Sequence, residues 1–195
     1  MLTLKLPAIY RKVQTLPDDP LDSIAYGMQT PNALCMILAY PIPYEKTMPL
    51  NKEMVIDGIR HYLAESQGII QVECNSTNNN VPYIYSIVKN ISQEGSLYIL
   101  TMHFIDEIEQ EAFAISAQFQ EIGTTGIRET NVYEYARRNN MVDEEANGWV
   151  KDPYDENFTY GIPMNLSENE MFDSAFPSHP LTQLRELLTY IIENN

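Results

Sequence analysis

Cys74 and His103 are the two residues whose types could together perform nucleophilic chemistry. A cysteine thiolate paired with an imidazole can attack a carbonyl carbon and form a covalent intermediate. His103 alternates with Ile99 and Ile105 along one face of an expected strand, and Cys74 ends another expected strand. The spacing alone does not establish contact. Two interpretations follow: a small hydrolase that uses the Cys74/His103 pair, or a half-buried histidine and a small apolar thiol.

Residues 143–154 partly match a calcium-binding loop of the EF-hand type. Asp143 and Glu145 occupy the first and third positions, and Gly148 occupies the sixth. The twelfth position is Tyr154, where an EF-hand needs a bidentate glutamate to complete the oxygen coordination. The segment is therefore expected to be an acidic turn.

Carboxylates also gather in an expected turn between two strands, and they could in principle serve acid/base or glycosidic chemistry. Such chemistry requires two carboxylates held a few ångströms apart. An exposed turn does not usually hold them so, and we expect these side chains to be solvated; they are Asp106, Glu107, Glu109 and Glu111.

The remaining motifs that carry chemistry are absent from the sequence. There is no P-loop, no G-x-G-x-x-G, no G-x-S-x-G and no H-E-x-x-H. His179 lies between Pro177 and Pro180, at an expected helix start, where the helix dipole disfavours its protonation. We therefore predict no catalytic residues, no cofactor and no metal site, and the sequence does not indicate which residues bind a partner.

Charge limits the classes of partner. The formal net charge is −15, with 27 acidic against 12 basic residues. Nucleic acids and anionic membranes attract net cationic surfaces, so neither is an expected partner. A basic or exposed apolar protein would suit this charge.

Features of secreted chains are missing. The first residues alternate apolar and polar types and reach Pro7 early, unlike an export signal. The nearly uncharged run at 32–44 is shorter than the roughly 20 residues that span a bilayer. Cys35 and Cys74 form no C-x-x-C motif, so two reduced thiols in a cytoplasmic protein are expected.

The first part of the chain has the pattern of an α+β domain. Residues 32–40 are apolar on both alternating faces, which predicts a central strand covered on each side and ended by Pro41 and Pro43. Asn51 is a good N-cap for a helix that should end near Gly68. The buried face of that helix is expected to contain Val55, Ile59, Tyr62 and Leu63.

Four strand-like segments follow this helix, and short links between the last three favour an antiparallel meander. The expected strands cover residues 69–74, 81–91, 97–106 and 111–122. Three tyrosines on them could cover the sheet or belong to an interface: Tyr83, Tyr85 and Tyr98. A second helix is expected at 127–139, with a buried edge made of Ile127, Val132, Tyr135 and Ala136.

The last part of the chain is more acidic. Residues 1–140 carry 10 basic and 16 acidic side chains, whereas residues 141–195 carry 2 and 11. We therefore expect an α+β domain at 1–140 and an acidic extension at 141–195. The extension is rich in aromatic residues that should pack on the domain or on a partner. Ser178 is an expected N-cap for a closing helix with a buried stripe of Leu181, Leu184, Leu188 and Ile191.

The order of elements resembles the PsbP-like fold. The resemblance covers about residues 8–140 and rests on the element order and on local runs, mainly Asn-Ala-Leu-Cys-Met-Ile-Leu-Ala-Tyr-Pro at 32–41 and Val-Pro-Tyr-Ile-Tyr-Ser-Ile-Val-Lys at 81–89. The superfamily includes the photosystem protein PsbP, the Mog proteins and the DcrB-like proteins. It implies a central antiparallel sheet flanked by helices that docks proteins without catalysis. One bacterial branch acts as chaperones or adaptors for specialised secretion.

Three functions are consistent with these patterns. The first is a non-enzymatic protein-binding module, such as a chaperone-like adaptor of a bacterial secretion system. The second is a small hydrolase that uses carboxylates or the Cys74/His103 pair. The third is a structural protein whose last helix, at 181–192, packs in trans; the sequence does not decide between a monomer and a dimer.

Overall fold

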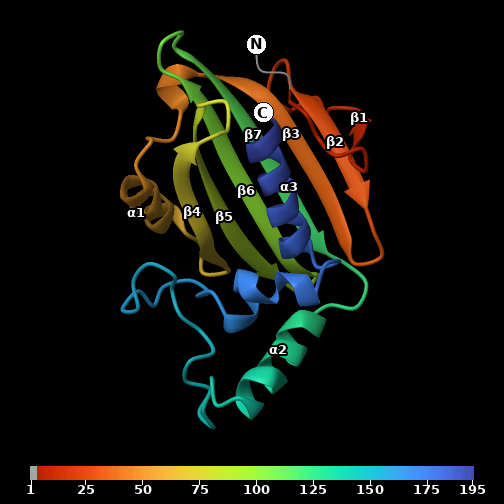
Figure 1. Cartoon of the computed structure of the whole chain (residues 1–195), viewed down its shortest axis with the longest axis vertical. Coiled ribbons are helices and arrows are strands. Elements are labelled where there is room, and N and C mark those ends of the chain that lie inside the picture. Colours follow the sequence, from red (N-terminus) through yellow and green to blue (C-terminus); the bar gives the residue numbers. More distant parts are fainter. Residues whose placement is uncertain (1–3) are drawn as a thin grey trace.

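The computed structural model describes residues 4–195, and its central feature is one seven-stranded antiparallel sheet with the order β1-β2-β3-β7-β6-β5-β4 (Figure 1). The α+β class is confirmed. The strands are β1 Arg11–Val13, β2 Ile24–Gln29, β3 Ala33–Pro43, β4 Gln67–Ser76, β5 Pro82–Ser92, β6 Gly95–Asp106 and β7 Glu111–Glu121.

Three α-helices accompany the sheet within residues 4–195: α1 Lys52–Tyr62, α2 Ile127–Arg138 and α3 Pro180–Asn194. Three short 3₁₀ helices connect them to the rest of the chain: η1 Tyr44–Lys46, η2 Leu166–Glu168 and η3 Glu170–Ala175. In Figure 1, α3 lies across the sheet, α1 lies beside β4, and α2 projects beyond the end of the sheet.

The predicted meander is confirmed. Strands β4, β5, β6 and β7 pair in sequence order, and β7 then pairs with β3. The sequence patterns did not reveal β1 and β2. β1 is only three residues long and exposed, and β2 contains Gly27, so neither has the long apolar alternation that marks the other strands.

The expected stop at Pro41 and Pro43 is wrong. β3 stays paired with β7 through Pro43, which lies opposite Glu111. β2 pairs with β3 only as far as Ala39, so both prolines lie where β3 has a neighbour on one side only. A proline can remain in a strand when its missing N–H would face an unpaired side.

Helix α1 begins as predicted and ends earlier. The Asn51 side chain accepts a hydrogen bond from Met54 N at 2.9 Å, which confirms the N-cap. The helix ends at Tyr62 because Leu63 is already extended, and Gly68 belongs to β4. Tyr62 is not on the buried face: it is 84% exposed, because α1 contacts β4 mainly through Val55 and Ile56.

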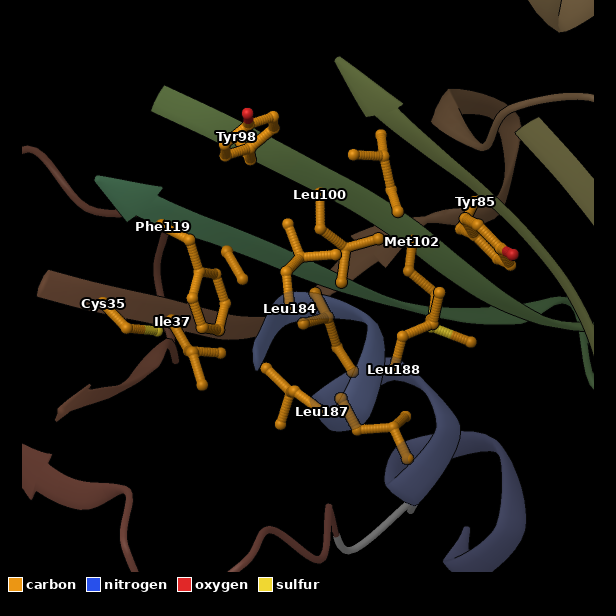
Figure 2. Packing of buried hydrophobic residues seen from close by; sticks show 14 of the residues in the cluster. Cys35, Ile37, Tyr85, Tyr98, Leu100, Met102, Phe119, Leu184, Leu187 and Leu188 are labelled. Carbon is orange, nitrogen blue, oxygen red and sulfur yellow. The ribbon is translucent and has the colours of Figure 1, made fainter. Parts of the chain in front are cut away.

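One face of the sheet, here called the covered face, packs under α3 (Figure 2). The stripe predicted for the closing helix is buried against it, and Leu184 is 0% exposed. Side chains from several strands meet this stripe, among them Cys35, Ile37, Leu100, Met102 and Phe119. The three strand tyrosines are also buried on this face, so they are core residues and not an exposed interface.

The closing helix lies on the chain's own sheet, whereas the structural hypothesis placed it in trans. His179 is its N-cap, through a bond of 3.2 Å from Leu181 N to Nδ1, so the expectation of Ser178 is wrong by one residue. Pro180 follows at the first helical position, where its missing N–H costs nothing.

Buried charges close one end of the covered face. Lys89 Nζ lies 2.7 Å from Glu168 Oε2, and both side chains are buried. The Tyr98 hydroxyl donates to the other carboxylate oxygen of Glu168 at 3.4 Å. An ion pair removed from water in this way depends on both partners, because either charge alone would be costly to bury.

Helix α2 has a different buried edge from the one predicted. Val132 and Ala136 are buried as expected, but Ile127 and Tyr135 are exposed, and Arg128 is buried in their place. Arg128 donates to two backbone oxygens, to Thr182 Oγ1 and to Asp173 Oδ1. These bonds satisfy a charged group that hydropathy would place in solvent.

The extension also closes over β4. The Tyr154 hydroxyl lies 2.6 Å from Val72 N and accepts its hydrogen bond, and Ile162 N donates to Gln67 O at 2.7 Å. The two backbones approach so closely that a Cβ on Gly68 would lie 1.7 Å from Ile162 O. Glycine is therefore required at this crossing.

Candidate functional site

The structure does not bring Cys74 and His103 together. Cys74 of β4 pairs with Ile84 of β5, and Ile84 pairs with His103 of β6, so a whole strand separates the two. Two inter-strand spacings of about 4.8 Å put their backbones roughly 10 Å apart. Met48 N donates to Nδ1 of His103 at 2.9 Å.

Neither group is tuned for a thiolate–imidazole pair. Burial lowers the pKa of His103 to about 4, so its imidazole is neutral at pH 7. Burial and the nearby carboxylate of Glu73 raise the pKa of Cys74, which disfavours the thiolate. A hydrolase built on this pair therefore has no geometric support.

The two acidic segments form self-contained turns. Asp143 accepts hydrogen bonds from Glu145 N and Asn147 N, and its bonds to Asn147 lower the pKa of the Asp143 carboxyl. Asp106 likewise accepts from Ile108 N and Glu109 N. Their carboxylate oxygens cap backbone N–H groups, which is the ordinary role of aspartate in a turn.

The second face of the sheet has much less cover than the first, and it is here called the open face. It is made of the side chains that β3, β6 and β7 point away from α3: Leu34, Met36, Leu38, Tyr40, Leu97, Ile99, Thr101, Ser116, Gln118 and Gln120. Met36 is 41% exposed. The prediction that β3 is covered on both faces is therefore wrong.

The open face is uncharged. None of these β3, β6 and β7 side chains is acidic or basic. The nearest charge in the row of Met36 is Arg11 of β1, which Gly27 of β2 separates from Met36. Apolar side chains of β3 and β6 flank a stripe of neutral polar side chains on β7, with Met36 opposite Gln118 and Gln118 opposite Ile99. Exposed apolar surface without charge is typical of an interaction site.

A groove between α1 and the strands β5 and β6 adjoins this face. Its volume is about 490 Å³, and it is lined mainly by apolar side chains, including Met48, Met54, Tyr62, Val88 and Ile99. Met54 is 61% exposed. Methionine side chains bend and polarise easily, which lets such a surface adapt to a bound chain.

Gly58 provides the space in the middle of the groove. It lies one helical turn from both Met54 and Tyr62, and a Cβ built on it would meet nothing within 4 Å. Glycine inside a helix is destabilising, so an open position of this kind is not explained by the packing of α1. It does leave room for a partner side chain.

Acidic side chains lie on the exposed side of α1, beside the residues that line the groove. Glu53 and Asp57 are exposed and one helical turn apart, and Asp57 is also about one turn from Met54. The nearest arginine of the helix, Arg60, is engaged with Asp152 at 2.6 Å and stacks on Phe158 at 4.4 Å, so it faces away. The border therefore favours a partner with positive charge.

Two other hollows are more charged. A hollow of about 660 Å³ near Tyr44 and Phe113 contains the carboxylates of Glu45, Asp106 and Glu111. A hollow of about 720 Å³ beside α3 is lined by several charged side chains of α3 and η3. The groove at α1 is distinct because it continues into an uncharged sheet face.

Comparison with known proteins adds no assignment. No protein-family model matches the chain, and no curated protein is similar enough to count as a match. Across residues 4–195, none of the helices has the length and apolar character needed to cross a membrane.

Proposed function

We propose that this chain is a non-enzymatic protein-binding module that uses the open face and the adjoining groove. The observation that carries the proposal is an uncharged, partly apolar sheet face on a chain of net charge −15. A chain with a net charge of −15 would be expected to place some charged side chains on an exposed face that only met water.

The occupant that fits best is an amphipathic helix from another protein. A helix already packs on this sheet in a similar way, because the apolar stripe of α3 lies across the covered face (Figure 1). A partner helix would set one apolar side chain over Gly58 and others over Met36 and Ile99. Its flanks would carry lysine or arginine opposite Glu53 and Asp57.

A second copy of the chain is a weaker candidate for the occupant. Two chains that each carry a net charge of −15 repel one another, and the border of the groove is itself acidic. A chaperone-like adaptor would use such a surface for a basic client, as the PsbP-like resemblance implies. We also propose that the chain has a PsbP-like fold and acts in bacterial secretion.

The test compares two variants of the same glycine. Gly58→Ala leaves the groove open, whereas Gly58→Trp fills it, and both are used as bait beside the wild-type chain in native extracts at moderate salt. We expect one protein in stoichiometric amount with the wild type and with Gly58→Ala, and its loss with Gly58→Trp. Purified partner should then bind more weakly as salt rises, because its basic flanks are screened.

Met36→Arg and Ile108→Arg provide a second matched pair. Met36 lies on the open face, and Ile108 lies in the exposed turn between β6 and β7. Binding should be lost only with Met36→Arg. Equal recovery with Gly58→Trp, recovery of the bait alone, or a wild-type dimer that Met36→Arg dissociates would each contradict the proposal.

A further inference from the structure

Two carboxyl groups and an imidazole meet where β7, α2 and α3 come together (Figure 1). Glu121 is the last residue of β7, Glu129 lies in the first turn of α2, and His179 caps α3. One side-chain oxygen or nitrogen atom from each residue lies within 4.8 Å of the other two. The fold therefore places two acidic groups, here called the carboxyl pair, beside a histidine that is only 7% exposed.

The imidazole of His179 is a hydrogen-bond donor to this pair. Its Nδ1 accepts from Leu181 N at 3.2 Å, so the proton of the neutral ring lies on Nε2. Nε2 is buried and has no hydrogen-bond partner among residues 4–195, and the same is true of Oε2 of Glu129. An unsatisfied donor therefore lies close to an unsatisfied acceptor, and each costs about 1–3 kcal/mol while it stays so.

His179 does not supply a positive charge at this position. A second proton on the ring would have to bind Nδ1, which would break the hydrogen bond that caps α3. Burial and the charges of Arg128 and Arg185 lower the pKa of His179 to about 3. The negative charge of the carboxyl pair must therefore be compensated by another group.

The charged groups packed around the carboxyl pair do not balance it. The titratable groups from the neighbouring elements are Lys89 of β5, Tyr98 of β6, Arg128 of α2, Glu168 of η2, Asp173 of η3 and Arg185 of α3. Lys89 pairs with Glu168, whereas Arg128 and Arg185 both pair with Asp173. Within residues 4–195 neither member of the carboxyl pair has an ion-pair partner. Three cations therefore face four carboxyl groups, and one negative charge is left over if all four are ionised.

We propose that Glu121 and Glu129 share one proton in the folded chain, which makes the junction of β7, α2 and α3 sensitive to pH. The shared proton removes the excess negative charge, as it does when two carboxyl groups occupy one buried site. Nε2–H of His179 then donates to an oxygen of the pair that remains ionised. Small side-chain rotations would form these bonds, because the atoms already lie within 4.8 Å.

The other contacts of the pair leave room for this proton. Oε1 of Glu121 accepts from Gly126 N at 3.0 Å, and the second oxygen of that carboxyl has further acceptor capacity. A cavity of about 110 Å³ is lined by Glu121 and His179 and also by the exposed residues Thr124 and Ser178, so it reaches the surface. The cavity is large enough for water, which would exchange the proton with solvent.

The junction should weaken as the pH rises. Burial raises the pKa of both carboxyls above the ordinary value of 4.5, so the folded chain holds a proton that the unfolded chain has released. The contribution to stability is complete below about pH 4.5 and is lost as the pH rises through the higher pKa of the folded pair. Each pH unit within this window changes the folding equilibrium constant by up to about tenfold.

The experiment follows the carboxyl groups of the full chain during a pH titration. Glutamate side chains are labelled with carbon-13 at the carboxyl carbon, and their NMR shifts are recorded from acid to neutral pH and above. We expect two resonances to titrate as a pair, at higher pH than those of exposed glutamates. This outcome is independent of partner binding at the open face.

The variants replace one carboxyl with an amide of the same shape. Glu121→Gln and Glu129→Gln change the pair, and Glu134→Gln on the exposed side of α2 is the control. In each pair variant the remaining carboxyl should ionise at lower pH, because it no longer faces a second carboxyl. Denaturant unfolding should then show a smaller loss of stability with rising pH than in the wild type. The difference between the two profiles excludes His103, which all chains share.

Two results would overturn the proposal. One is that every glutamate of the folded wild-type chain titrates in the range of exposed glutamates, which would mean that both carboxyls are ionised and that water fills the gap. The other is a wild-type dependence of stability on pH in both Glu121→Gln and Glu129→Gln. The NMR titration of the wild type decides the matter if a pair variant fails to fold.

Discussion

The two faces of the sheet begin from the same strands and end in different environments. On the covered face, side chains such as Ile37 and Leu100 are fully buried beneath α3. On the open face, Met36 and Leu34 of the same strand β3 are each 41% exposed. Alternate residues of one strand therefore contribute to a core on one side and to a surface on the other.

The difference shows that apolar character does not by itself indicate burial. Helix α3 crosses β3, β6 and β7, whereas α1 contacts β4 and leaves β3 uncovered. The larger apolar core lies on the covered face and a smaller one lies beneath α1, so we expect the exposed part of the open face to tolerate substitution without loss of the fold. Substitutions on the two faces should separate stability from binding.

The largest expected loss of stability follows from breaking the buried ion pair at the end of the covered face. Lys89→Met leaves the Glu168 carboxylate without its cation, and the free energy of unfolding should fall by about 3–5 kcal/mol. Denaturant unfolding measures this. The exposed pair of Arg138 and Glu134 is the control, and Glu134→Gln should cost less than about 1 kcal/mol.

Leucine truncation beneath α3 should be the next largest effect. Leu184→Ala removes a fully buried side chain and should cost about 2–5 kcal/mol, because it leaves a cavity in the core. Met36→Ala on the open face should cost less than about 1 kcal/mol. Similar losses in the two variants, measured by denaturant unfolding, would mean that the open face is also part of the stabilising core.

A pH-dependent effect is expected from His103, which points to the side of α1 and is buried near Met48. Its pKa is about 4 in the folded chain and about 6.5 when unfolded, so the unfolded chain takes up the proton first. The stability contribution is complete above about pH 6.5 and is lost as the pH falls towards about 4, with a total near 3 kcal/mol.

His103→Asn isolates this contribution. Asparagine retains an acceptor for Met48 N and does not titrate. Denaturant unfolding at several pH values should show the wild-type stability falling more steeply than that of the variant between pH 6.5 and 4. Parallel profiles would indicate that the folded imidazole protonates as readily as the unfolded one.

The smallest effects on stability are expected from substitutions at two glycines, and these effects should have opposite signs. Gly58→Ala should raise the free energy of unfolding by about 0.5–1 kcal/mol, since the helix gains a methyl group that meets no atom within 4 Å. Gly68→Ala should destabilise instead, because its Cβ would collide with Ile162 O. Thermal unfolding distinguishes the two, and a destabilising Gly58→Ala would mean that the groove is already filled.

Local signals in the sequence predicted much of the fold. Asn51 was identified as a cap, the four strands of the meander were placed, and the stripe from Leu181 to Ile191 was identified as buried. Each depends on neighbours along one element, which a periodic pattern records. The errors at Pro43 and Gly68 concern where elements end. Pairing with β7 extends β3 through Pro43, and Gly68 lies where the extension crosses β4.

The candidate sites were not predictable in the same way. Whether a second helix covers β3 depends on tertiary packing. The sequence therefore could not distinguish a strand with one exposed face from a core strand that is buried on both faces. His179 was placed at a helix start by Pro180, and the structure makes its side chain the cap of that helix.

The glycine crossing between Gly68 and Ile162 has a consequence for how the chain behaves in concentrated solution. β4 is the last strand of the sheet, and an outer strand with free backbone groups is a template for aggregation. The crossing segment occupies the start of that outer edge. Proteolytic cleavage at the exposed residues 155–157 would free this segment from one side and leave a sheet edge prone to polymerise.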